Sequence, residues 1–205
     1  MKPLYVVGLI VASVAGVVAL SGVTKQSGEA PRVAAKAETL ATAVEAPPFP
    51  PLEGELWNLT SIDARLQIPE GWSIGRMGND ERLLRNVDDP LDGNMNLVLM
   101  PNAFGFTVDE LLAENVEELS VNPDLHLEDR REIYVMGRKV LRFDYNGTPR
   151  TGGDPVRFVA VVWPRGRFQV ALTTTVRAKL WGEVSAGVDA ALESLQIRWP
   201  MPRAK

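Results

Sequence analysis

The sequence predicts one α+β domain of ordinary size, placed behind an apolar segment and a linker. Three observations lead to this prediction. An apolar run of 20 residues lies near the start, a proline-rich stretch follows it, and the remainder mixes strand patterns of period two with helical patterns. The 205 residues are 45% hydrophobic and 23% charged, as in globular proteins. The chain has no Cys, which excludes disulfides, thiol catalysis and Cys-based metal sites.

The apolar run, Leu4–Val23, carries no charge and as a helix would reach about 30 Å, the thickness of a bilayer's hydrocarbon core. Two interpretations compete for it. A secretory signal peptide would use Lys2 as its basic start and Ala19 and Ser21 as a weak cleavage site. Because the run is longer than the usual signal core of about 7–15 residues, we favour an uncleaved transmembrane anchor over residues 1–24.

Within this run, small side chains recur every fourth residue at Gly8, Ala12 and Gly16. Residues with this spacing lie on one face of a helix, where they let a second membrane helix approach closely. Signal sequences and anchors are also rich in Gly and Ala by composition. The three residues therefore form a candidate packing face rather than an assigned one.

Residues 25–52 form a predicted linker that contains Pro31 and a cluster of four further prolines, Pro47, Pro48, Pro50 and Pro51. A flexible linker of this length spans roughly 30 Å. The Lys and Arg residues flanking the apolar run give no clear orientation, but the acidic, Ala/Pro-rich sequence beyond residue 37 suits export. We therefore expect the following domain, residues 53–198, to be periplasmic or otherwise extracytoplasmic.

The first part of the domain reads as short strands separated by turns. Residues Ala64–Ile68 alternate as a strand and stop at the turn Pro69-Glu70-Gly71-Trp72. Further strands are predicted at Trp72–Arg76, Arg82–Val87 and Asn96–Met100.

The polar stretch Asp88–Asn94 resembles a calcium loop only superficially. An EF-hand loop beginning at Asp88 would need an oxygen ligand where Pro90 stands and a Glu where Leu99 stands. We interpret the stretch as a turn, and no metal site or cofactor is predicted.

The clearest local signal marks the start of a helix. Thr107 is followed three residues later by Glu110, the pattern of a capping box, and Phe106 and Leu111 flank it as a hydrophobic staple. A helix is therefore predicted over Val108–Leu119, with one apolar side and one acidic side.

Four strands with tight connections then predict an antiparallel meander. Two of the connections are the turns Met136-Gly137-Arg138 and Pro164-Arg165-Gly166. The predicted strands are Leu125–Val135, Lys139–Tyr145, Val156–Trp163 and Arg167–Thr175.

An amphipathic helix is predicted to close the domain over Ala178–Leu195, because apolar residues such as Leu180, Val184, Val188 and Leu192 recur every three or four positions. Trp72, Trp163 and Trp181 are expected to fill or edge the core. Residues 199–205 form a basic tail.

The order of these motifs resembles the PsbP-like and DcrB/LpqN-like domains of photosynthetic membranes and bacterial envelopes. The resemblance covers about residues 56–198. Its carriers are Ile68-Pro69-Glu70-Gly71-Trp72, the helix opening Phe106-Thr107, Gly137 with the strand after it, and Ser194-Leu195. It implies an α/β/α sandwich around a central antiparallel sheet, and non-enzymatic accessory or assembly roles at membrane complexes. Many members of these families are lipoproteins, whereas this chain lacks the Cys that would be acylated.

The residues that catalysis would require are scarce. The single His, His126, alternates between Leu125 and Leu127 and is expected to be exposed on its strand. No nucleophile with a nearby base is recognisable, so no catalytic residue is assigned and the chain is not predicted to be an enzyme. The net charge of −4, without a basic run, argues against nucleic acid as a partner.

The sequence thus predicts a non-catalytic, membrane-anchored accessory or assembly subunit, whose domain docks on a larger integral membrane complex. The alternative is an exported protein of the envelope that binds a small molecule or lipid between the sheet and a helix.

Overall fold

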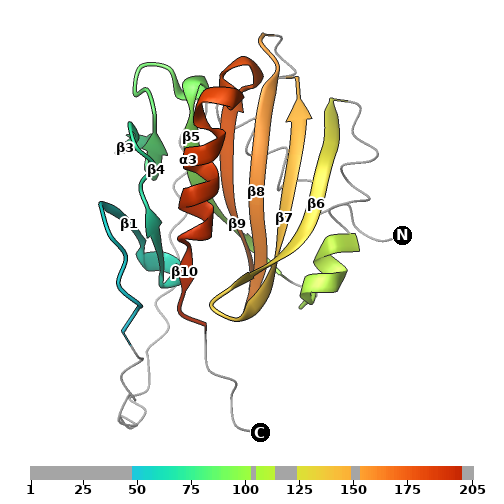
Figure 1. Cartoon of the computed structure of the whole chain (residues 1–205). Coiled ribbons are helices and arrows are strands. Elements are labelled where there is room, and N and C mark those ends of the chain that lie inside the picture. Colours follow the sequence, from blue (N-terminus) through green and yellow to red (C-terminus); the bar gives the residue numbers. More distant parts are fainter. Residues whose placement is uncertain (1–47, 103–104, 114–123, 149–152, 200–205) are drawn as a thin grey trace, which may run out of the picture.

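The structure, a computed structural model, describes residues 48–102, 105–113, 124–148 and 153–199. Within these residues the chain forms two antiparallel sheets, the larger ordered β3-β4-β5-β9-β8-β7-β6 and the smaller β1-β2-β10 (Figure 1). The small sheet consists of β1 (Leu56–Leu59), β2 (Ala64–Gln67) and β10 (Gln196–Ile197). The large sheet consists of β3 (Ser73–Met77), β4 (Asp80–Leu84), β5 (Asn94–Pro101), β6 (Leu125–Val135), β7 (Arg138–Gly147), β8 (Val156–Arg165) and β9 (Phe168–Arg177).

The predicted meander is confirmed as the four strands β6 to β9, each paired antiparallel with the next. Met136 and Gly137 both have positive φ angles, 49° and 76°, so the β6–β7 hairpin closes through a two-residue turn of type I′. The β8–β9 hairpin turns at Gly166, whose φ is 59°.

Helices cover both faces of the large sheet. Helix α3 (Trp181–Glu193) follows the short 3₁₀ turn η3 (Ala178–Leu180) and buries Val184, Val188 and Leu192 against one face together with the small sheet. On the other face, helical residues 108–113 bury Leu111 against Phe143 and Phe158. The α+β class with an antiparallel sheet is therefore confirmed.

The predicted capping box is present at the start of this second helix. The backbone N–H of Thr107 donates to Glu110 at 2.8 Å, and the backbone N–H of Glu110 donates to the Thr107 hydroxyl at 3.4 Å. Phe106 and Leu111 pack in the same apolar cluster, as a staple requires. The part of the predicted helix beyond residue 113 lies outside the described residues.

The small sheet was only partly predicted. Its middle strand β2 was expected, whereas β1 and the two-residue β10 are too short for an alternating pattern to show. Ile197 pairs with Ala64 and Trp57 pairs with Leu66, so the two outer strands join the beginning and the end of the domain.

One predicted strand is displaced. The sequence placed a strand at Arg82–Val87, but β4 ends at Leu84, because the N–H of Arg85 donates to the carbonyl of Gly93 and closes a loop. That loop contains the 3₁₀ turn η2 (Pro90–Asp92).

In the described part of the chain, no helix is both long and apolar enough to cross a bilayer. The candidate anchor Leu4–Val23, with Gly8, Ala12 and Gly16, lies outside that part.

Candidate functional site

The single His has the environment that its strand position predicts. The His126 side chain is exposed on β6, and its Nε2 lies 3.8 Å from a carboxylate oxygen of Glu128. Because the His126 side chain is exposed, it does not take part in a buried reaction centre.

The polar loop Asp88–Asn94 has a structural partner that the sequence did not reveal. Arg177, at the end of β9, lies 2.6 Å from Asp89 and 3.5 Å from Asp154, and it also pairs with Asp92. A hydrogen bond from Asn86, opposed by burial and supported by Arg177, holds the pKa of Asp92 below its ordinary value of 3.8. These carboxylates are thus engaged by a guanidinium, and no group of three or more potential metal ligands occurs among the described residues.

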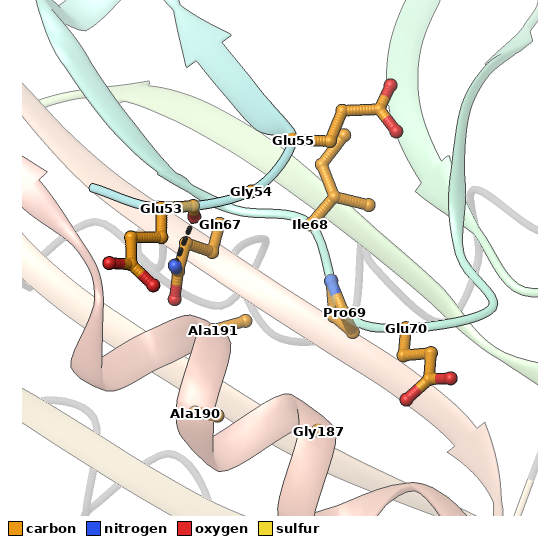
Figure 2. A pocket seen from close by; sticks show the side chains of 10 residues that line it. All are labelled: Glu53, Gly54, Glu55, Gln67, Ile68, Pro69, Glu70, Gly187, Ala190 and Ala191. Carbon is orange, nitrogen blue, oxygen red and sulfur yellow. Dashed lines mark hydrogen bonds between the residues drawn. The ribbon is translucent and has the colours of Figure 1, made fainter.

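A shallow groove of about 290 Å³ lies between the chain just before β1, the end of β2 and helix α3 (Figure 2). Its floor is formed by Gly187, Ala190 and Ala191, while three carboxylates stand at its rim, those of Glu53, Glu55 and Glu70. The side-chain amide of Gln67 donates to the carbonyl of Glu53 and holds the first segment in place. The volume is at the lower limit of small-molecule sites.

A second groove, of about 340 Å³, lies at the end of the large sheet where two hairpins turn. Alternate turns of an antiparallel meander lie at the same end of the strands, so the turns at Met136–Gly137 and Gly166–Arg167 are neighbours. We call this end of the sheet, together with Asn102, Phe106, Arg198 and Trp199, the hairpin end; it is the lower end of the sheet in Figure 1.

The hairpin end is rich in cations. Arg138, Lys139 and Arg165 line the groove, and no carboxylate is among the described residues that line it. The guanidinium of Arg138 lies 5.4 Å from the ring centre of Trp199, and that of Arg167 lies 5.1 Å from the ring centre of Phe168.

Two of these cations have no acidic partner in the part of the chain that the structure describes. Lys139 pairs with Asp109 at 2.5 Å and with Glu132 at 3.1 Å. Among the described residues, by contrast, no carboxylate lies within 4.0 Å of Arg165 or Arg167. Burial lowers the pKa of Arg165 below its ordinary value, with Asp63 opposing the shift. Arg165 instead donates to the carbonyl of Arg198 at 3.1 Å.

Both hairpin turns were predicted from the sequence, but their position side by side was not. The available signal was an Arg beside each turn, Arg138 and Arg165, combined with the rule that alternate turns share an end of the sheet. Trp199 could not be placed there, because its position depends on β10, which the sequence does not reveal.

No protein-family model matches the chain, and no curated protein matches it by sequence. Among solved structures it is similar to cyanobacterial PsbP (CyanoP) from Synechocystis sp. PCC 6803, with a TM-score of 0.53 and 14% identity over 70% of this chain and 92% of that one. It is also similar to LpqN of Mycobacterium tuberculosis, described as involved in cell envelope biogenesis, with a TM-score of 0.47 and 14% identity over 70% of this chain and 84% of that one. The described domain has the PsbP-like fold, as the order of its sequence motifs predicted.

Proposed function

We propose that this protein is a non-catalytic accessory or assembly subunit, held in a membrane of the cell envelope by Leu4–Val23. Residues 25–52 form the tether, and the domain of residues 53–198 docks on a larger membrane protein complex outside the cytoplasm. Residues 199–205 form a basic tail. The observation that carries this proposal is the PsbP-like fold behind a run of 20 apolar residues.

The small residues of the apolar run give the proposal a specific contact. Gly8, Ala12 and Gly16 would lie on one face of the membrane helix and pack against a helix of the partner. Replacing Gly8 and Gly16 together by Leu removes that close approach without making the segment less apolar. The variant is expected to remain in the membrane but to leave the complex.

The experiment is native electrophoresis of source membranes in mild detergent, followed by mass spectrometry of what migrates with the chain. The matched control replaces Val6 and Val14 by Leu, because these residues lie on the opposite face of the same helix. Association that survives the Gly8→Leu, Gly16→Leu pair would reject the packing face. Migration of the chain by itself, without peptides from residues 1–21, would reject the anchor and the proposal with it.

The groove of Figure 2 favours a second function, that of an exported protein that binds a small apolar molecule or lipid. Its floor of short side chains leaves space, although the groove lies between β2 and α3 rather than between α3 and the large sheet. Ala190→Phe would fill this space and abolish such binding, whereas docking through the membrane helix would be unaffected.

A further inference from the structure

The described part of the chain begins near the hairpin end. The ring of Phe49 lies 4.4 Å from the guanidinium carbon of Arg198 and 4.8 Å from that of Arg65. The backbone carbonyl of Arg198 in turn accepts a hydrogen bond from the guanidinium of Arg165, whose side chain lines the hairpin-end groove. The described domain therefore begins close to the hairpin end, and the segment that precedes it in sequence carries the 20-residue apolar run.

Exposed apolar side chains accompany the cations at this end. Tyr134, Met136 and Phe168 are 72%, 46% and 37% exposed. Met136 occupies a turn position with positive φ, where Asn or Gly would be the more stable choice. A large apolar residue that breaks a local rule in an exposed turn suggests a role outside the fold itself.

We propose that the hairpin end is a membrane-contacting surface that binds the anionic headgroups of the bilayer in which the chain is anchored. Arg138, Arg165 and Arg167 contact the lipid phosphates, while Tyr134, Met136 and Phe168 enter the headgroup layer. This inference rests on the proposed function for its anchor, but it adds an orientation for the domain and names a ligand, anionic phospholipid.

The chemistry of both partners supports this assignment. Guanidinium groups bind phosphate oxygens through paired hydrogen bonds, and aromatic rings concentrate in the headgroup layer of membranes.

The overall charge of −4 does not oppose such binding. Strand β9 has 10 residues, so the carboxylates around Arg177 at its far end lie roughly 30 Å from the hairpin turns. At physiological ionic strength charges are screened over about 8 Å. Among the described residues, the acids at the hairpin end itself are paired, Asp109 and Glu132 with Lys139 and Asp63 with Arg198. The bilayer surface therefore responds to the remaining cations beside it and not to the distant acids.

A chain without Cys allows a direct test, because one introduced Cys is the only labelling site. The full-length Met136→Cys variant carries an environment-sensitive fluorophore, and Val87→Cys is its matched control. Val87 is 63% exposed and lies in the loop between β4 and η2, at the opposite end of the sheet. Each labelled chain is mixed with vesicles of phosphatidylcholine, alone or with an equal part of phosphatidylglycerol, that contain a spin-labelled quenching lipid.

We expect lipid to quench the fluorophore at position 136 in the anionic vesicles only, and to leave position 87 unquenched in both. Arg167→Glu should lower the ratio of docked to undocked domain by about 30-fold, since the local charge changes by two units. Arg130→Glu, the same change at an exposed position midway along β6, should leave this ratio unchanged. Raising the salt should release the domain from the lipid.

Equal quenching at positions 136 and 87, or equal quenching in neutral and anionic vesicles, would overturn the inference. Absence of quenching at position 136 would also overturn it and would leave the hairpin end to a protein partner. Resistance of the chain to alkaline carbonate extraction from the same vesicles tests the anchor separately. The quenching experiment thus tests lipid binding by the hairpin end, and the extraction tests the membrane anchor of the proposed function, so that either one can fail without the other.

Discussion

At the residue scale, a buried guanidinium joins helix α3 to the sheet. Arg142 on β7 donates to Asp144 on the same strand, and its Nη2 lies 2.7 Å from Asp189 on α3. Burial by itself would lower the pKa of Arg142, but the hydrogen bonds to Asp144 and Asp189 raise that pKa above its ordinary value. Because Arg142 and Asp144 alternate with Leu141 and Phe143, the sequence predicts that they share one face of the sheet. It does not predict that helix α3 covers this face.

The first prediction follows from this network. Arg142→Met should lower the free energy of unfolding by about 3–5 kcal/mol, because the carboxylate of Asp144 would remain buried without a counter-charge. Asp189→Asn is the control and should cost about 1 kcal/mol or less, since the Asp189 side chain is 42% exposed and the inner pair survives. Urea titration of the full chain in mild detergent measures both values. Equal costs for the two variants would show that the inner pair is not what stabilises the site.

At the element scale, the capping box shows why one helix start was predictable and two strands were not. The signal at Thr107 and Glu110 lies within four consecutive residues and requires no distant partner. Strands β1 and β10 exist only because β2 pairs with both of them, and no local pattern reports a pairing across 131 residues of sequence such as that of Arg65 with Gln196.

The capping box also gives a pH-dependent prediction. Hydrogen bonds from the backbone N–H and hydroxyl of Thr107 lower the pKa of Glu110 below its ordinary value of 4.5. A carboxyl group with a lowered pKa in the folded state stabilises the protein above its unfolded-state pKa and loses that contribution as the pH falls through the folded-state value. Glu110→Gln should therefore destabilise the domain at neutral pH, and the difference from the wild type should vanish in acid.

Urea titrations at several pH values test this expectation. Thr107→Ala should cost about 1 kcal/mol at neutral pH, the usual contribution of a helix N-cap. Ser73→Ala, at an exposed position on β3, is the control and should change stability by less than about 0.5 kcal/mol. A Glu110→Gln effect that persists unchanged in acid would mean that the ionised carboxylate is not what caps the helix.

At the scale of the whole molecule, the class of fold was predictable from the sequence, whereas the location of the hairpin end was not. Periodicity reveals which side chains share a face, and it gave the meander and both helix patterns. The hairpin end depends instead on contacts between Phe49, Arg198 and Arg165, which are brought together by the closure of β10 on β2. Such contacts between distant parts of the chain leave no local trace in the sequence.

The architecture predicts an uneven distribution of stability. Strand β8 is paired on both sides and buries seven of its residues, all except Arg157 and the two at its end, between the two apolar clusters. The edge strand β6 has one paired neighbour and is mostly exposed, and β3 at the other edge is similar. Amides of β8 and of its neighbour β9 should therefore exchange with solvent only through global unfolding, while those of β6 and β3 exchange through local opening.

Hydrogen exchange of the full chain, followed by mass spectrometry, measures this order. Equal protection in β6 and β8 would contradict it and would mean that the sheet opens as one unit. Addition of anionic vesicles then extends the measurement to the hairpin end. Protection should rise at the turns of the β6–β7 and β8–β9 hairpins and stay unchanged in the loop around η2, because lipid contacts only the first of these two ends of the sheet.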